Sequence, residues 1–144
     1  MKEGFAMGKN ENEVKNNLFG FGKLNTQYAN VFIGNSYLNS LVSKDDNIDV
    51  GVSSVNFEPG CRNNWHIHHN GFQILLVTAG EGWYQEEGKT AQLLKPGDVV
   101  AIHEGVKHWH GATKDSWFSH IAITKSESEW CEPVSDEEYD QLGK

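Results

Sequence analysis

Two histidine-bearing stretches of sequence decide the fold: WHIHHNGFQILLVTAG at residues 65–80 and KHWHGA at residues 107–112. Successive side chains of a β-strand point to opposite faces, so His66 and His68 share one face of a strand. The two histidines of the second stretch share a face by the same rule. All seven histidines of the chain lie between His66 and His120. If these strands close around one interior, several imidazoles meet inside it.

Regular turn signals divide the sequence around these stretches into short strands. Glu58-Pro59-Gly60 and Pro96-Gly97-Asp98 are turn sequences of the kind that separates strands. Within residues 50–57 the alternation changes parity at Ser53-Ser54, and a β-bulge there would restore a single buried face. The pattern predicts an all-β sandwich or barrel of about ten strands. The expected strands cover residues 37–42, 50–52, 55–57, 65–68, 72–78, 82–86, 90–94, 99–102, 107–111 and 117–124.

The two ends of the chain differ from this middle part. Residues 1–17 are charged, rich in Asn and aperiodic, and we expect a loose tail within a flexible N-terminal arm, residues 1–25. Residues 26–144 are expected to form a single domain. Ser135 and Glu138 have the spacing of a capping box, in which each side chain bonds the other residue's backbone N–H. They predict a short C-terminal helix.

The size and charge of the chain exclude several classes of function. Its 144 residues suffice for one domain core. The net charge of −8 argues against nucleic acid, whose phosphates are negative. No apolar run reaches the roughly 20 residues of a membrane span, and Cys61 and Cys131 alone make no disulfide framework. We therefore expect a cytoplasmic protein that acts on a small molecule and binds neither nucleic acid nor a membrane.

Histidines that converge inside a barrel indicate a metal site. Neutral imidazoles are ligands for Zn, Mn, Fe, Ni and Cu. A His-x-His pair on a strand aims two rings the same way, and a histidine from a distant strand can complete the site. The alternative is a set of solvated pocket histidines, which the matched periods of four histidines disfavour. His69 and His103 fall at a turn and in a loop, where exposure is expected.

The same residues carry a resemblance to the cupin superfamily. Both cupin motifs are present: Gly60-x5-His66-x-His68-x4-Gln73-x6-Gly80 and Gly97-x5-His103-x-Gly105-x2-His108-x3-Ala112. The first motif usually has Glu at Gln73, and the second usually has Pro at His103 and Asn at Ala112. The resemblance implies an all-β cupin, a double-stranded β-helix or jelly-roll barrel, here followed by the short C-terminal helix.

Further residues resemble one branch of these proteins. This branch contains small proteins associated with carboxymuconolactone decarboxylase and the bacterial cupin-type hydroxynitrile lyases. It is indicated by Phe57-Glu-Pro-Gly60, Pro96-Gly-Asp-Val-Val100, His108-Trp-His-Gly-Ala112 and His120-Ile-Ala-Ile123. In those lyases three His and one Gln hold Mn. The resemblance implies one divalent transition metal, Mn, Fe, Ni or Zn, and gives as its ligands His66, His68, Gln73 and His108.

Gln73 changes the charge of the implied site. Three His and a Gln contribute no negative charge, so a bound metal keeps its full charge and acidifies an oxygen beside it. A neutral ligand set also stabilises the lower oxidation state and differs from the two-His-one-carboxylate triad of iron oxygenases. Lewis-acid chemistry is therefore favoured over oxygenation. The alternative for Gln73 is an interior side chain bonded to backbone.

His110 and His120 are the candidates for proton transfer. Both are expected to face the interior, and neither occupies a cupin ligand position. In the lyase branch the matching histidines lie beside the metal and are implicated in acid–base work. Imidazole is suited to proton transfer near neutral pH. The alternative is that they orient a ligand, and for His110 the two readings weigh equally.

The leading hypothesis is a metal-dependent enzyme on a small polar organic substrate. The metal acts as a Lewis acid and His120 or His110 moves the proton, with a lyase reaction of the hydroxynitrile type as the concrete version. Two alternatives are an Fe(II)-dependent dioxygenase and a non-catalytic module that binds a small ligand or metal. Small cupins commonly dimerise through their sheets, so we expect a homodimer, with the apolar residues between Phe19 and Leu24 as an arm.

Overall fold

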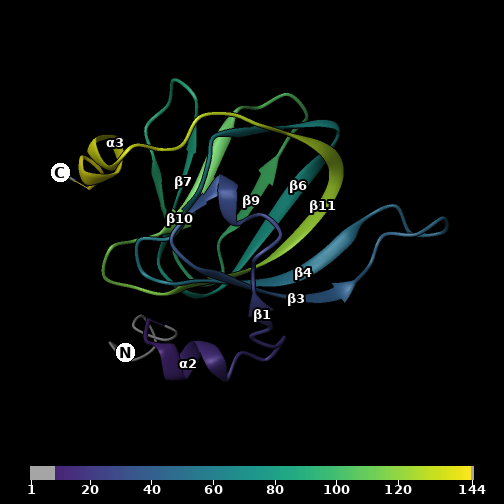
Figure 1. Cartoon of the computed structure of the whole chain (residues 1–144), viewed down its shortest axis with the longest axis horizontal. Helices are drawn as coiled ribbons and strands as arrows, with labels where there is room; N and C mark the ends of the chain where they lie inside the picture. The colour runs from purple at the N-terminus through teal and green to yellow at the C-terminus, as the bar shows by residue number, and fades with distance from the viewer. Residues whose placement is uncertain (1–8, 144) are drawn as a thin grey trace.

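Antiparallel strands curled into a barrel make up most of residues 9–143, the part of the chain that the computed structural model describes (Figure 1). Eleven strands of this part form one sheet in the order β1-β3-β4-β11-β6-β10-β5-β2, with β7 attached to β10, β8 attached to β7 and β9 attached to β6. The result confirms the all-β barrel. No helix between residues 9 and 143 is long and apolar enough to cross a membrane. The strands are β1 (Lys23–Leu24), β2 (Phe32–Ile33), β3 (Ser36–Val42), β4 (Gly51–Phe57), β5 (Arg62–Asn63), β6 (His66–Gly80), β7 (Gly82–Glu86), β8 (Gln92–Leu94), β9 (Val99–Ile102), β10 (His108–Ala112) and β11 (Phe118–Trp130).

The two longest strands, β6 and β11, form the spine of the barrel. They pair antiparallel along nearly their whole length, from His66 opposite Trp130 to Gly80 opposite Phe118. β11 also pairs with β4, and β6 also pairs with β9 and β10. Side chains on the inner face of this pair therefore meet those of β4 and β10 inside the barrel.

A β-bulge divides β6 where two separate strands were predicted. His69 lies opposite Glu127 and Phe72 opposite Lys125, so β6 has one residue more than β11 in this interval. Asn70 has a φ of +57°, in the left-handed region. The extra residue changes the parity of β6. As a result, Gln73 faces the same interior as His68 although the two are five residues apart.

The predicted bulge in β4 is absent. β4 pairs without a shift with β11, and the irregularity lies in the neighbouring strand, between Ser40 and Val42 of β3. The prediction of a bulge in β4 was wrong because both faces of this strand are covered by other parts of the protein. Ser53 and Val55 line the interior cavity, while Ser54 and Asn56 are fully buried on the outer face. A strand buried on both sides has no simple apolar alternation.

The N-terminal segment differs from the loose tail predicted for residues 1–17. Residues 1–8 lie outside the described part, but Glu11–Lys15 form a short helix, α2, capped by the Asn10 side chain. Val14 of this helix is fully buried. The segment continues over the outer face of the barrel, where Phe21 packs on Tyr37 with ring centroids 4.4 Å apart. A helix of only five residues is too short to show a recognisable apolar period in the sequence.

Asn56 ties this segment to the barrel. Its Nδ2 donates to the carbonyl oxygen of Phe21 at 3.0 Å, and its Oδ1 accepts from Asn17 Nδ2 and Ser119 Oγ. Asn56 is fully buried, so each of these bonds satisfies a polar atom that would otherwise be left unpaired. The outer face of β4 is thereby sealed directly behind the cavity.

The C-terminal helix α3 (Asp136–Asp140) is capped as predicted. Ser135 Oγ accepts from the Glu138 backbone N–H, and the Glu138 carboxylate accepts from the Ser135 backbone N–H. Tyr139 is buried and its hydroxyl donates to the Ala112 carbonyl oxygen at 2.6 Å. The helix therefore docks on the outer side of β10, where a second apolar cluster forms from Trp65, Trp109, Val134 and Tyr139.

Gly71 is the residue on which the bulge depends, because a Cβ atom there would overlap the carbonyl group of Lys125. We expect Gly71→Ala to lower the free energy of unfolding by about 1–3 kcal/mol. Gly51→Ala is the matched control, since its nearest contact would be Val42 O at 3.9 Å, and a change below about 1 kcal/mol is expected. Urea denaturation of both variants measures the difference. Equal effects would show that Gly71 is not required by packing.

Candidate metal centre

Three histidines meet on the inner face of β6 and β10. His66 and His108 are direct partners across the two strands, and His68 follows on the same face of β6. One nitrogen from each ring lies within 4.8 Å of the others. Exposed fractions of 2%, 2% and 0% for His66, His68 and His108 place the group deep in the barrel. This arrangement matches the convergence predicted from the period of the strands.

The partners of His66 and His108 assign their tautomers. The Nδ1–H of His66 donates to the carbonyl oxygen of Asn64 at 2.8 Å, and that of His108 donates to Val106 O at 2.9 Å. Each ring therefore presents an unprotonated Nε2. The Nε2 of His108 is buried and has no hydrogen-bond partner among the described residues. A buried lone pair without a partner is unfavourable unless a cation or a donor takes it up.

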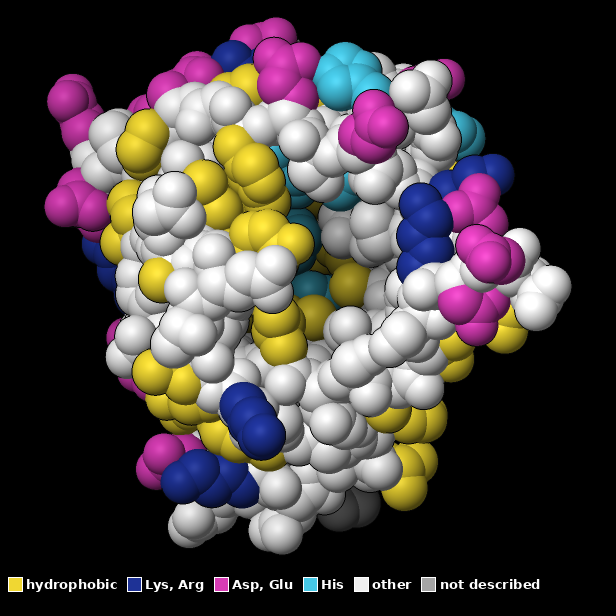
Figure 2. Space-filling view, turned by 45° about the vertical axis from the view of Figure 1, so that its right-hand side comes forward, with side chains coloured by type: hydrophobic (Ala, Val, Ile, Leu, Met, Phe, Trp, Pro, Cys, Tyr) yellow, Lys and Arg dark blue, Asp and Glu magenta, His cyan; other side chains and the backbone are white. Residues whose placement is uncertain are grey.

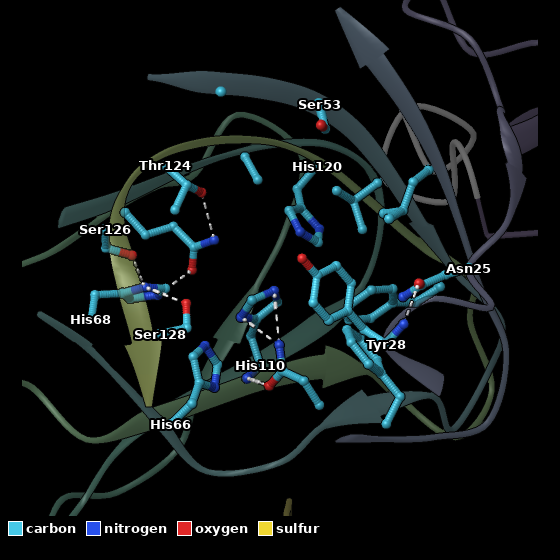
Figure 3. Close-up of a pocket in the computed structure, with 18 of the residues that line it drawn as sticks. Asn25, Tyr28, Ser53, His66, His68, His110, His120, Thr124, Ser126 and Ser128 are labelled. Atoms are coloured by element: carbon cyan, nitrogen blue, oxygen red, sulfur yellow. Dashed lines mark hydrogen bonds between the residues drawn. The ribbon is translucent and has the colours of Figure 1, made fainter. Parts of the chain in front are cut away.

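Gln73 lies beside His68, at the edge of the three-histidine group. Its Oε1 is 3.1 Å from His68 Nε2, and its Nε2 donates to Thr124 Oγ1 at 3.0 Å. The alternative in which Gln73 bonds to backbone does not apply, because both partners are side chains. The other ring nitrogen of His68, Nδ1, lies 2.6 Å from Ser126 Oγ. These contacts are visible in Figure 3.

Burial keeps the three imidazoles neutral. Loss of hydration lowers the pKa of His66 well below its usual value and lowers the pKa of His108 to about 4. The pKa of His68 is lowered too, for the same reason. A histidine binds a metal only as neutral imidazole. Three neutral rings around an unpaired buried lone pair therefore fit a divalent transition metal.

A cavity of about 500 Å³ opens onto this group. Figure 2 shows the hollow, with histidine rings at its base. One wall is aromatic and the wall beside His68 carries hydroxyls. No Asp, Glu, Lys or Arg of the described residues lines it. The volume and the apolar lining are typical of a small-molecule site. The aromatic lining residues are Tyr28, Phe32, Phe57 and Trp130, and the hydroxyl-bearing ones on β11 are Thr124, Ser126 and Ser128.

His120 lies in the same cavity, on β11, as expected. It is 1% exposed, and neither ring nitrogen has a hydrogen-bond partner among the described residues. The rings of Phe57 and Phe118 flank it at 5.3 and 5.0 Å between centroids. Burial in this apolar setting lowers the pKa of His120 to about 3. It is a neutral imidazole whose one N–H and one lone pair have no hydrogen-bond partner among the described residues.

His110 lies next to His120, with ring centroids 4.9 Å apart. Its pKa is also lowered well below the usual value by burial. Both polar atoms of the Asn63 side chain contact it: Oδ1 accepts from the His110 backbone N–H at 3.0 Å, and Nδ2 lies 3.3 Å from ring Nδ1 and 3.4 Å from ring Nε2. Asn63 thus holds the strand and the ring together, so His110 is more constrained than His120.

Several cavity residues were missed by the sequence reasoning. Ser126, Ser128 and Trp130 have the same parity as His120, so extending the alternation of the last strand beyond Thr124 would have found them. Tyr28 and Asn63 come from short segments without a recognisable period. His69 pairs with Glu129 at 2.7 Å and His103 is exposed, and both lie apart from the three-histidine group, as predicted.

A barrel of antiparallel strands with an interior three-histidine group defines a metal-binding β-barrel protein. The chain belongs to the cupin family: the sequence pattern of the cupin domain matches residues 53–123. A relative from Granulicella tundricola, an (R)-mandelonitrile lyase, is 43% identical over an alignment of 115 residues, and the match covers 77% of this chain and 87% of the relative.

Solved structures agree with this assignment. A cupin-like protein of Thermotoga maritima is 41% identical and superposes with a TM-score of 0.82, over 90% of this chain and 100% of that chain. A predicted oxalate decarboxylase of Thermotoga maritima has a TM-score of 0.65 over 73% of this chain and 93% of its own, at 21% identity. The second likeness concerns the fold alone.

The buried neutral histidines make the stability of the metal-free protein depend on pH. An unfolded histidine has a pKa of about 6.5, whereas folding lowers the pKa of His120 to about 3. Between these values the unfolded chain binds more protons, so stability falls as the pH is lowered below about 6.5. Each such group contributes a slope of up to about 1.4 kcal/mol per pH unit.

Urea unfolding of chelator-treated protein from pH 7 to pH 4.5 measures this slope. We expect His120→Asn to reduce the slope and the exposed control His103→Asn to leave it unchanged. The slope, rather than the absolute stability, is the readout, because the substitution also alters packing. Identical slopes for wild type and His120→Asn would contradict the neutral state of His120.

Proposed function

We propose that this chain is a metal-dependent lyase that cleaves the carbon–carbon bond of a small hydroxynitrile. The observation that carries the proposal is the placement of His120, a neutral imidazole with both nitrogens unpaired, in the same uncharged cavity as the three-histidine group. The 43% identity to an (R)-mandelonitrile lyase supports the reaction type. The ligands of one divalent metal, Mn, Fe, Ni or Zn, would be His66, His68, Gln73 and His108.

The four proposed ligands determine how much of its positive charge a bound metal keeps. Its four members are neutral, so the ligands do not diminish the charge of the cation. When bound, a divalent metal supplies a Lewis acid that makes a hydroxyl group beside it more acidic. The chain contributes the rest: it holds the ligands and provides the proton acceptor. The absence of a carboxylate among these ligands favours this chemistry over oxygen activation.

His120 moves the proton in the proposed reaction. One of its ring nitrogens accepts the proton of the substrate hydroxyl. The electron pair of the O–H bond then forms the carbonyl, and the carbon–carbon bond breaks with its electron pair leaving on cyanide. Cyanide takes the proton from the imidazolium, which gives hydrogen cyanide and an aldehyde. The low pKa of His120 favours this return of the proton, because a charged ring is unstable between Phe57 and Phe118.

The lining of the cavity supports a neutral substrate. The described residues that line it include no cationic side chain that would bind a carboxylate or phosphate. The aromatic rings of Tyr28, Phe32 and Trp130 provide an apolar surface for the part of the substrate that does not react. A charged substrate entering this cavity would lose its hydration without gaining a counter-charge.

Metal content is the first test of the proposal. Mass spectrometry of the purified protein should find about one Mn, Fe, Ni or Zn per chain, by the coordination chemistry of a three-histidine site. His66→Ala/His108→Ala should lose it, because two of three imidazole ligands are gone. His69→Ala/His103→Ala is the matched control with two histidines removed elsewhere. If the wild-type protein holds no metal even after reconstitution, the proposed enzyme function is contradicted. A cupin that only binds small molecules would then remain.

The second test is turnover of racemic mandelonitrile, followed by release of benzaldehyde. We expect His120→Ala to lower kcat/KM by about 10²- to 10⁴-fold, the usual contribution of one acid–base group, with metal content unchanged. His103→Ala should match the wild type. Undiminished turnover in His120→Ala would remove His120 from the mechanism. If the Fe(II)-loaded protein consumes oxygen and does not cleave mandelonitrile, the result would support a dioxygenase and contradict the lyase proposal.

A further inference from the structure

We infer that the metal site consists of two unlike halves, a preset pair and an adaptable pair. His66 and His108 form the preset pair. His68 and Gln73 form the adaptable pair, whose protons rearrange when a metal binds, and Ser126 is the positioning residue for that change. The inference rests on the metal site of the proposed function and does not depend on the lyase reaction.

The preset pair has its protons fixed by the backbone. A carbonyl oxygen only accepts hydrogen bonds, so the contacts of His66 with Asn64 O and of His108 with Val106 O each require a proton on Nδ1. The Nε2 lone pairs of both rings face the site in every state of the protein. No proton has to move at either ring before a cation is bound.

The adaptable pair lacks this constraint. His68 Nδ1 faces two hydroxyls, Ser126 Oγ at 2.6 Å and Ser128 Oγ at 3.4 Å. A hydroxyl donates or accepts, so His68 is stable with its proton on either nitrogen. Of the three imidazoles in the group, it alone has a hydroxyl rather than a carbonyl behind it.

The contact between His68 and Gln73 selects a tautomer in the metal-free site. Gln73 Nε2 donates to Thr124 Oγ1, which leaves the amide Oε1 pointing at His68 Nε2, 3.1 Å away. Two lone pairs at this distance repel, so the contact is favourable only when Nε2 carries the proton and donates it to Oε1. Ser126 then donates its hydroxyl hydrogen to Nδ1. In this arrangement His68 Nε2 and Gln73 Oε1 are hydrogen-bonded to each other, and neither offers a lone pair to a cation.

Metal binding requires the opposite arrangement. His68 Nε2 and Gln73 Oε1 must both offer lone pairs to the cation, so the imidazole proton has to be on Nδ1. One proton leaves Nε2 for water and one arrives at Nδ1 from water, and the ring stays neutral throughout. Ser126 turns its hydroxyl and accepts the Nδ1–H. Without a hydroxyl at this place, the binding tautomer would bury an unpaired N–H.

Direct observation of the tautomer tests the inference. Protein with ¹⁵N-labelled histidine distinguishes Nδ1–H from Nε2–H by the ring nitrogen shifts, and Zn²⁺ is a suitable diamagnetic probe. We expect His68 to be protonated on Nε2 in chelator-treated protein and on Nδ1 after one equivalent of Zn²⁺. His66 and His108 should be protonated on Nδ1 in both states. A metal-free His68 already protonated on Nδ1 would overturn the inference.

Zn²⁺ affinity in variants tests the role of the hydroxyl. We expect Ser126→Ala/Ser128→Ala to bind Zn²⁺ about 10–100-fold more weakly in competition with a chelator, the usual effect of removing a partner behind a metal ligand. Ser126→Thr/Ser128→Ala, which restores one hydroxyl, should recover most of the affinity. Ser53→Ala is the matched control, since Ser53 lines the cavity from β4, well away from His68 (Figure 3). Equal affinities for the alanine pair and wild type would also overturn the inference.

The outcomes separate this inference from the proposed function. Tight Zn²⁺ binding without a change of tautomer refutes the inference and leaves the lyase proposal standing. A change of tautomer in a protein without turnover refutes the lyase reaction and supports the inference. Failure of the wild type to bind any metal refutes both.

Discussion

The site of this protein depends on one extra residue in β6. The bulge at Asn70 and Gly71 reverses the parity of the strand, so that His68 before it and Gln73 after it face one interior. Without the bulge, a strict alternation would turn Gln73 to the outer surface. The backbone of Lys125 leaves room only for glycine at this point. A local backbone irregularity in the longest strand therefore brings together the β6 residues of the proposed metal centre, which β10 completes with His108.

Desolvation is the second physical condition for the proposed function. The barrel buries five imidazoles, and loss of water keeps them neutral. One nitrogen from each of three of them lies within 4.8 Å of the others, where a cation can bind, and neither ring nitrogen of His120 has a hydrogen-bond partner among the described residues. The same burial that weakens the metal-free protein in acid thus keeps these imidazoles in the neutral form that the proposed chemistry requires. The two covers of the barrel, the N-terminal segment over β4 and α3 over β10, exclude water from its outer faces.

The sequence predicted most of the fold and part of the site. The strand pattern, the C-terminal capping box and the interior direction of His66, His68 and His108 were readable, because each follows from local periodicity or spacing. The helix at residues 11–15 was missed because one turn has no period. The bulge was placed in β4 instead of β3 because β4 is buried on both faces. Tyr28 and Asn63 could not be assigned to the cavity, since only the closed barrel brings their short segments to it.

The sequence by itself determined that histidines two residues apart share a strand face, and the cupin spacing implied their meeting. Periodicity is a local property of the backbone, which is why it can be read directly. The tertiary structure decided which groups face the ring nitrogens. Backbone carbonyls stand behind His66 and His108, whereas hydroxyls of β11 stand behind His68. Those partners come from loops and from a strand about 60 residues away, and hydrogen bonding across strands exists only once the barrel has closed.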